Sequence, residues 1–243
     1  MKTLVLLHGW GMRPAVFESL SARLAPRYRV HSMPLAGYDG SPPCDPYELR
    51  TLAQSVARAA PERCLVAGWS LGAQVALEWA RTVPHQVERL VLIGATPCFA
   101  QREDWSPAIE AQVLRDFAVA LACDCEGTLK RFVSLLAQGD RESKAVARVL
   151  RACLTAQPAV DVCTLQQGLD VLLETDLRGV LQTIGHDVLV IHGEHDALVP
   201  PAAGEYLANT LPRARLAVIG GAAHAPFISD VDSVARAMQE FLA

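Results

Sequence analysis

A serine flanked by glycines two positions away on each side lies at the centre of residues 68–72, Gly-Trp-Ser-Leu-Gly. An apolar strand pattern at 64–67 precedes this segment, and a helix pattern at 71–82 follows it. A serine on such a sharp turn is pushed out of the sheet in a strained backbone conformation. The two glycines let strand and helix pass closely, and the helix N-terminus favours developing negative charge. We predict that Ser70 is a nucleophile; the alternative is a packing turn with an inert serine.

A serine hydroxyl is a weak nucleophile near neutral pH and needs a base that a carboxylate orients. The candidate base is His224, which lies in the loop directly after the last strand pattern. Asp196 follows the fifth strand pattern and precedes His224 by 28 residues, about one helix and one strand. We predict Asp196 as the acid, with Glu194 and Asp187 as weaker rivals. The alternative for His224 is a hydrogen-bonded loop histidine.

Acyl transfer also needs amide N–H groups directed at the negative oxygen of the tetrahedral intermediate. The segment His-Gly-Trp-Gly (8–11) follows the first strand pattern, so the amides of Trp10 and Leu71 are the predicted donors. We expect His8 itself to be structural. Residues 192–196, His-Gly-Glu-His-Asp, contain possible zinc ligands, but they lie at a strand end with no cysteine near. We therefore predict neither a metal nor a cofactor.

The elements that must position these residues follow a regular rhythm. Short apolar runs typical of strands alternate with helical patterns through the first hundred residues and resume near residue 187. Continuous apolar strands separated by helices indicate an α/β fold, with a mostly parallel sheet and helices on both faces. The predicted strands are 3–7, 29–33, 64–67, 89–93, 187–191 and 215–219, and the predicted helices are 15–25, 48–60, 71–82, 201–211 and 231–242.

Between the fourth and fifth strands the rhythm stops. From about residue 99 to 184 the sequence shows only amphipathic helical stretches, near 106–122, 127–137, 141–156 and 160–173. The simplest interpretation is a core of residues 1–97 and 187–243 that is interrupted by an all-helical cap of residues 98–186.

Length and composition exclude several classes of protein. The chain has 243 residues, of which 51% are hydrophobic and 20% charged, so it can bury a core and is not disordered. A net charge of −4 argues against a basic nucleic-acid binder. The longest uncharged apolar stretch, 64–77, is shorter than the ~20 residues that a membrane span needs. The seven cysteines contain no CxxC pair and indicate thiols in a reducing cytoplasm. We expect a cytoplasmic monomer.

With these elements in place, the chain resembles the α/β-hydrolases over nearly its whole length. Five further phrases narrow the resemblance: LLHGWG (6–11), GWSLG (68–72), PCF (97–99) followed by DW (104–105), DLR (176–178) and AAHAPFIS (222–229). By these phrases the chain resembles the pimeloyl-[acyl-carrier-protein] methyl ester esterase family of biotin synthesis. The PCF and AAHAPFIS phrases carry more of this narrower resemblance than the general hydrolase pattern does.

The resemblance implies an ester substrate carried on an acidic acyl carrier protein and a triad of Ser70, Asp196 and His224. The substrate-binding segment of the family corresponds to a stretch of one cap helix. That stretch is Phe132, Val133, Ser134, Leu135 and Leu136. The basic positions that the family presents to its carrier correspond to Arg131, Lys144 and Arg148.

The sequence departs from the family pattern in three places. The leading β-hairpin is absent, since the chain begins at the strand before residues 8–11. Residues 34–37 are Pro-Leu-Ala-Gly, where the family has Asp-x-Pro-Gly. Leu136 stands where the family has glutamine. The last two differences bear on specificity and not on the class of reaction.

The cap has its own electrostatic pattern. Residues 128–151 carry six basic and two acidic residues, whereas the rest of the chain carries 16 and 24. At ~100° per residue, Arg141, Lys144, Arg148 and Arg151 fall within about an 80° arc of one helix face. Such a stripe would attract an acidic carrier protein, and the alternative is a solvated helix face. The aromatic residues expected to wall an acyl pocket are Trp10, Trp69, Phe99, Phe132 and Phe227.

Three functions remain open at this point. The first is a serine carboxylesterase that acts on a methyl ester bound to acyl carrier protein. The second keeps the triad but acts as a general short-chain carboxylesterase, thioesterase, lactonase or haloperoxidase, since fold and triad do not determine the leaving group. The third is a hydrolase-fold receptor with little turnover. Dehalogenase and epoxide hydrolase chemistry is disfavoured because those reactions use an aspartate where this chain has Ser70.

Overall fold

The fold is built on a six-stranded parallel sheet, seen in a computed structural model that describes residues 1–155 and 159–243. The strand order is β2-β1-β3-β4-β5-β6, and every neighbouring pair is parallel. The central strands are apolar along their length because helices cover both faces of the sheet. The strands are β1 (Thr3–Leu7), β2 (Arg29–Met33), β3 (Cys64–Trp69), β4 (Val87–Ile93), β5 (Val188–Gly193) and β6 (Ala214–Ile219).

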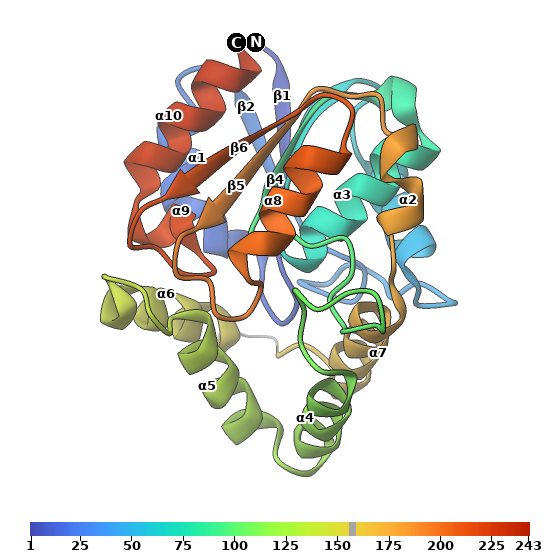
Figure 1. Cartoon of the computed structure of the whole chain (residues 1–243), viewed down its shortest axis with the longest axis vertical. Helices are drawn as coiled ribbons and strands as arrows, with labels where there is room; N and C mark the ends of the chain where they lie inside the picture. Colours follow the sequence, from blue (N-terminus) through green and yellow to red (C-terminus); the bar gives the residue numbers. More distant parts are fainter. Residues whose placement is uncertain (156–158) are drawn as a thin grey trace.

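Helices flank the sheet on two sides (Figure 1). On one side are α1 (Glu18–Leu24) and α10 (Val231–Leu242), and on the other are α2 (Leu49–Ala59), α3 (Leu71–Thr82) and α8 (Pro201–Thr210). Short helical turns complete the core. These are η1 (Pro14–Phe17), η2 (Pro84–Gln86), η3 (Arg178–Thr183) and α9 (Pro226–Ser229). The predicted fold class, a mostly parallel sheet with helices on both faces, is confirmed.

Four further helices lie between β4 and β5 in the chain and gather at the end of the sheet to which its strands point (Figure 1). They are α4 (Ala111–Cys123), α5 (Cys125–Leu136), α6 (Ser143–Thr155) and α7 (Val162–Glu174). Because the carboxyl ends of parallel strands carry the functional loops, these helices cover the edge at which Ser70, Asp196 and His224 lie. The limits of this cap at residues 98 and 186 stay a prediction.

Several predicted helix limits differ from the structure. The helix expected at 106–122 begins at Ala111, because the backbone of Ile109 bonds residues 99 and 101 instead of a helical turn: its N–H donates to the Phe99 carbonyl and its carbonyl accepts the N–H of Gln101. The helix expected at 15–25 divides into η1 and α1. The helix expected at 141–156 begins at Ser143, which leaves Arg141 outside it, and its last predicted residue lies outside the described residues.

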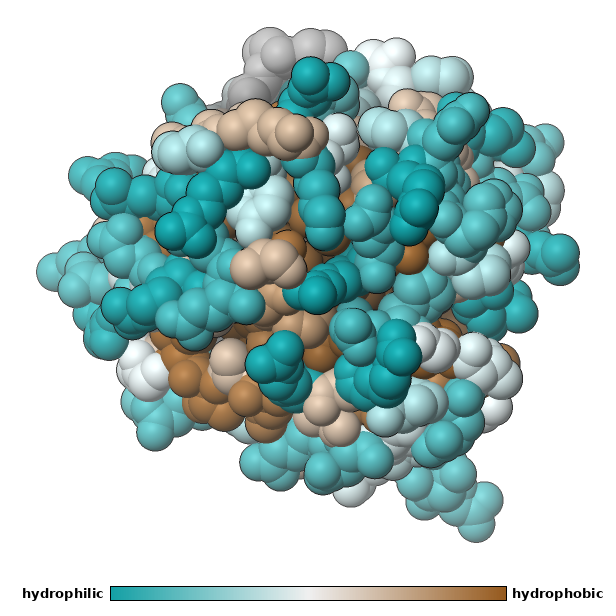
Figure 2. All heavy atoms as spheres, turned by 90° about the horizontal axis from the view of Figure 1, so that it is seen from above, coloured by the Kyte–Doolittle hydropathy of each residue, from teal (hydrophilic) through white to brown (hydrophobic). Residues whose placement is uncertain are grey.

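The surface drawn in Figure 2 is mainly hydrophilic, with apolar residues gathered in patches between the polar ones. Most large apolar side chains are buried, and the exposed ones include Val113 and Val119 on α4 and Val162 on α7. Within the described part of the chain, no helix is both long enough and apolar enough to cross a membrane.

The passage from β3 to α3 requires two glycines. A Cβ atom at Gly68 would lie 2.2 Å from the carbonyl oxygen of Gly72, and one at Gly72 would lie 2.3 Å from that of Leu7. Both contacts are with backbone and cannot be relieved by rotating a side chain. Helix α3 is therefore packed against β1 and β3 at a distance that only glycine allows.

We expect Gly72→Ala to destabilise the fold by ~1–3 kcal/mol, because the new methyl group would have to displace the end of β1. Alanine in a helix normally stabilises relative to glycine, so the sign of the effect is diagnostic. Equilibrium unfolding in urea measures it. The matched control is Gly179→Ala in the exposed η3, where a Cβ meets nothing within 4 Å. A Gly72→Ala variant as stable as the control would contradict the close packing.

Candidate active site

Ser70 occupies the turn between β3 and α3 in a backbone conformation that residues other than glycine rarely adopt. Its φ is 56° and its ψ is −119°. Its N–H donates to the Ile93 carbonyl of β4 at 3.0 Å, and its carbonyl accepts the N–H of Ala73 at 2.9 Å. Hydrogen bonds to the neighbouring strand and to the first turn of α3 thus hold the strained turn. The side chain is partly exposed, as a nucleophile must be.

Asp196 and His224 form a buried hydrogen-bonded pair. The Nδ1–H of His224 donates to Oδ2 of Asp196 at 2.7 Å, and the two residues are 1% and 3% exposed, His224 being the more buried. The other oxygen of Asp196 accepts the N–H groups of Leu198 at 3.0 Å and Val199 at 2.8 Å. This arrangement fixes the tautomer of His224, so that its Nε2 is a proton acceptor.

The Nε2 atom of His224 has no hydrogen-bond partner within the described residues, and no hydrogen bond joins it to Ser70 there. Such contacts are often long in a site without substrate. Trp69 holds the backbone of His224, since its indole N–H donates to the carbonyl of His224 at 2.8 Å, and the two rings lie 5.6 Å apart between centroids. The structure thus brings Asp196 and His224 together and leaves the third contact, to Ser70, unmade.

The two rivals of Asp196 have other partners. Glu194 is exposed and accepts the N–H of Gly221 at 2.8 Å. Asp187 precedes β5 at the opposite end of that strand and forms an ion pair with Arg213 at 3.1 Å. Neither carboxylate forms a hydrogen bond with His224.

The two predicted oxyanion donors are the amides of Leu71, which follows Ser70 in the chain, and of Trp10, which lies in the loop after β1. In the described part of the chain, neither the Trp10 nor the Leu71 amide donates to another protein group. The loop after β1 passes close to the nucleophile, since a Cβ at Gly9 would lie 3.2 Å from the Cβ of Ser70. That loop is held by Tyr38, whose hydroxyl accepts the N–H of Gly11 at 3.2 Å. Two free amides beside a strained serine are what stabilisation of an oxyanion requires.

His8 has the structural role that the sequence predicts for it. Its Nε2 accepts the N–H of Leu35 at 3.1 Å, and its Nδ1–H donates to the Gly9 carbonyl at 2.9 Å. Burial lowers the pKa of His8 to about 4, so the ring is neutral at physiological pH. The neutral ring is thus wedged between the loop after β1 and the loop after β2.

A narrow apolar cavity of about 60 Å³ opens on Ser70 beneath the cap. Ser70 is the one polar residue in its lining. Helices α4, α5 and α7 supply most of the walls, so the cap determines what reaches the nucleophile. The lining residues are Trp10, Ser70, Phe99, Ile109, Val113, Leu114, Phe117, Phe132, Leu135, Leu169, Leu172 and Leu198. The lining residues on α4 and α7 were not predicted from the sequence. Their helical spacing was visible, but an apolar stripe of this kind usually packs into the hydrophobic core and does not line a binding site.

The predicted substrate-binding segment, residues 132–136, lies on helix α5, and its side chains point to three places: the cavity, the core and the surface. Phe132 and Leu135 line the cavity, and Phe132 packs edge-on against the Trp10 indole at 5.0 Å. Val133 and Leu136 are buried in the core. Ser134 is exposed and its hydroxyl donates to the Lys130 carbonyl at 3.2 Å. A helix places neighbouring residues about 100° apart, so five consecutive residues cannot all face one cavity.

Two of the five aromatic residues expected in the acyl pocket are not in its lining. Trp69 and Phe227 pack against each other at 5.1 Å, and Phe227 packs against Phe17 at 4.9 Å in the core. Trp69 ends β3, a strand in which every residue is buried, and it packs into the core beside Phe227. Trp10, Phe99 and Phe132 do line the cavity.

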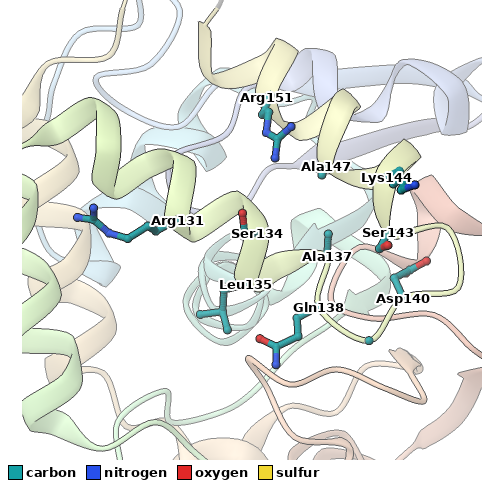
Figure 3. Close-up of a pocket in the computed structure, with 11 residues that line it drawn as sticks. Arg131, Ser134, Leu135, Ala137, Gln138, Asp140, Ser143, Lys144, Ala147 and Arg151 are labelled. Carbon is teal, nitrogen blue, oxygen red and sulfur yellow. The ribbon is translucent and has the colours of Figure 1, made fainter.

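The basic residues of the cap surround an open groove of about 610 Å³ between α5 and α6 (Figure 3). Arg131, Lys144 and Arg151 line it, whereas Arg148 is exposed on α6 outside its lining. The Arg131 guanidinium forms a long ion pair with the Asp124 carboxylate, 3.9 Å between nitrogen and oxygen. Within the described residues, Lys144, Arg148 and Arg151 pair with no acidic side chain. Arg141 does not belong to this surface, because its guanidinium is paired with Asp230 at 2.7 Å.

The possible zinc ligands at residues 192–196 each bond another group of the protein. His192 is buried and its Nε2–H donates to the Val199 carbonyl at 2.9 Å, whereas the Nδ1–H of His195 donates to Gly139 at 3.1 Å. Among residues 1–155 and 159–243, no three His, Cys, Asp or Glu side chains are close enough to hold a metal ion.

Residues 4–237 match the alpha/beta hydrolase family. The chain belongs to that family. It is 41% identical over 241 residues to a pimeloyl-[acyl-carrier protein] methyl ester esterase of Xanthomonas campestris pv. campestris, covering 99% of this chain and 94% of the relative. It is 40% identical over 242 residues to the protein of the same name from Aromatoleum aromaticum, covering 98% and 96%. The predicted resemblance is confirmed, and the hydrolase is a carboxylic ester hydrolase.

Solved structures of other hydrolases share the fold. An esterase from Exiguobacterium antarcticum gives a TM-score of 0.89 at 23% identity, covering 100% of this chain and 92% of that one. A bromoperoxidase from Bacillus anthracis gives 0.89 at 21%, covering 99% and 91%. At these identities the likeness concerns the fold alone.

The neutral state of His8 makes the stability of this hydrolase depend on pH. The folded chain holds the pKa of His8 at about 4, whereas histidine in the unfolded chain titrates near 6.5. Between about pH 6.5 and pH 4, His8 is therefore protonated in the unfolded chain but stays neutral in the folded chain. The free energy of unfolding accordingly falls as pH is lowered toward 4. We expect His8 to account for a loss of roughly 3 kcal/mol over that interval.

Urea titrations at a series of pH values measure this effect. His8→Gln, whose amide oxygen can still accept the Leu35 N–H, should show a shallower loss of stability between pH 7 and pH 4 than the wild type. The control is His31→Gln, since His31 is exposed on β2. A wild-type pH dependence in His8→Gln would contradict the burial argument.

Proposed function

We propose that this hydrolase is a serine carboxylesterase that hydrolyses the methyl ester of pimeloyl-acyl-carrier protein. The observation that carries the proposal is the likeness to curated methyl ester esterases at about 40% identity over almost the full length of both chains. The buried Asp196–His224 pair and the strained Ser70 turn at the mouth of an apolar cavity support a triad of these three residues. Such an enzyme needs no metal or cofactor.

In the acylation step, Ser70 Oγ attacks the ester carbonyl while its proton passes to Nε2 of His224. The tetrahedral oxygen becomes negative between the amides of Trp10 and Leu71, which have no other acceptor among the described residues. The Asp196 carboxylate stabilises the imidazolium through the 2.7 Å hydrogen bond to Nδ1. The C–O bond to methanol then breaks, and methanol leaves with the proton from Nε2.

In the deacylation step, water gives a proton to His224 Nε2 and attacks the acyl-serine carbonyl. Collapse of this second intermediate returns the proton to Ser70 Oγ and releases the acyl chain as a carboxylic acid, which then loses its proton to solvent. The low exposure of His224 and Asp196 keeps competing water from their hydrogen bond.

The cap supplies the specificity in this proposal. The methylene chain of the substrate lies along the apolar walls of α4, α5 and α7, with Phe132 and Leu135 in contact. The carrier binds the outer surface of the cap at Arg131, Lys144 and Arg148, two of which border the groove between α5 and α6. Residues 128–151 of the cap carry six basic and two acidic residues on a chain of net charge −4, so this part of the cap attracts an acidic partner.

We propose a cytoplasmic location as well. All seven cysteines are free thiols, which suits a reducing compartment. The expected monomer stays a prediction.

The direct test is mass spectrometry of methyl pimeloyl-acyl-carrier protein after incubation with the enzyme. We expect the carrier to lose the mass of one methylene and to keep its acyl chain, and Ser70→Ala to abolish this change because no other residue can form the acyl-enzyme. A fluorophosphonate probe should label the wild type and the control Ser55→Ala on α2, but not Ser70→Ala. Release of the free carrier thiol would instead indicate a thioesterase and refute the proposal.

Carrier docking predicts a second outcome. Arg131→Glu, Lys144→Glu and Arg148→Glu together replace three attractions with three repulsions, so KM for the carrier-bound ester should rise by about tenfold to a thousandfold. Hydrolysis of a small chromogenic ester needs no docking and should stay near wild type. Added salt should lower wild-type kcat/KM for the carrier-bound ester only.

The matched control reverses three exposed arginines of the core, Arg27, Arg29 and Arg58, and changes the net charge equally. Arg29 begins β2, at the end of that strand away from the cap. If the control raises KM as much as the cap variant does, the effect is one of net charge. Equal losses on both substrates would indicate a damaged cap.

A further inference from the structure

Residues 139–141 connect α5 to α6 and bind the loop that carries His224. The Asp140 carboxylate accepts the backbone N–H of Ala223 at 2.7 Å, one residue before the base. The N–H of Arg141 donates to the Gly221 carbonyl at 2.9 Å. We call residues 139–141 the cap clamp; Figure 3 shows Asp140 on this connection, beside Ser143.

The burial of Asp140 has a cost that its hydrogen bonds must offset. The residue is 6% exposed, and no basic side chain in the described chain forms an ion pair with it. Its Oδ1 accepts the N–H of Glu142 at 2.8 Å, and its Oδ2 accepts the N–H of Ala223. A buried carboxylate without a cation is stable only if such bonds satisfy it. Serine or asparagine could accept the first bond, but only a carboxylate accepts both in this geometry.

The cap clamp also contacts the loop that carries the acid. The Nδ1–H of His195 donates to the Gly139 carbonyl at 3.1 Å, and His195 precedes Asp196. The N–H of His195 in turn donates to the Ala222 carbonyl at 2.8 Å. The backbone that leads to His224 is therefore bound by the cap on one side and by the acid loop on the other.

We propose that Asp140 is a positioning residue for the base. Its bond to Ala223 sets the position of His224 relative to Ser70, so that the seating of the cap on the core controls the rate of hydrolysis. This inference rests on the proposed function, because it requires His224 to be the base. Asp140 touches neither substrate nor reacting atoms and acts only through the base loop. It also borders the groove between α5 and α6, so a partner bound there lies next to the clamp.

The test compares Asp140→Ser with Asp140→Asn, using a small chromogenic ester. Both variants can keep the local turn to Glu142, and both lose the acceptor for Ala223; serine does so without placing a new donor there. We expect kcat to fall by about tenfold to a hundredfold, since a misplacement of 1 Å can cost that much, while KM stays unchanged. The low-field proton resonance of the His224–Asp196 hydrogen bond should shift or broaden in both variants.

Glu142→Gln is the matched control. It removes the same charge two residues away, from an exposed side chain, and leaves the backbone bond to Asp140 intact. His224→Ala is assayed in parallel. Wild-type kcat in Asp140→Ser beside an inactive His224→Ala would overturn this inference and leave the proposed function standing. A raised KM at unchanged kcat, or an unaltered proton resonance, would overturn it too. Near-normal turnover by His224→Ala would refute the proposed mechanism instead.

Discussion

The close approach of α3 to β1 and β3 is the constraint on which the rest of the site depends. Side chains at 68 or 72 would collide with backbone, so glycine at both positions lets the chain reverse within a few residues. That reversal forces Ser70 into its strained conformation and leaves the Leu71 amide without an acceptor in the described chain. It also brings the loop after β1 against Ser70. One packing contact thus places the proposed nucleophile and both proposed oxyanion donors.

Three histidines lie around this turn, and their surroundings give them different roles. His8 is kept neutral by burial and can only hold backbone. Burial also lowers the pKa of His192, which holds the Val199 carbonyl beneath the acid. Among the described residues, His224 is the histidine whose ring N–H forms a hydrogen bond with a carboxylate, at 2.7 Å, and its Nε2 has no partner there. Burial thus makes two histidines structural, whereas the carboxylate suits the third to the base role proposed for it.

The sequence was informative wherever one local rule determined the outcome. Strands β1 and β2 and helices α3 and α10 have the predicted limits, because apolar runs and capping residues define them within a few positions. The turn that carries Ser70 and the pairing of Asp196 with His224 could both be predicted, because the loops that follow parallel strands meet at one end of the sheet. The core location of Trp69 and the ion pair of Arg141 could not be predicted, since each depends on a contact with a distant segment. The start of α4 was missed because it depends on backbone hydrogen bonds between Ile109 and residues 99 and 101. The hydrogen bond of Asp140 could not be predicted from the sequence either, because its partner, the N–H of Ala223, lies 83 residues away.

Helix α5 shows how a cap can serve recognition and chemistry together. One face places Phe132 and Leu135 in the cavity over Ser70, and the adjacent face, which shares Leu135, borders the basic groove with Arg131 and Ser134. A helix is stiff along its axis, so displacement of the outer face must move the inner one. The C-terminal end of the same helix leads into Asp140, which binds the base loop. A carrier that pulls on the groove would therefore act on the acyl cavity and on the position of His224 at once, which gives the chain a physical route from docking to turnover.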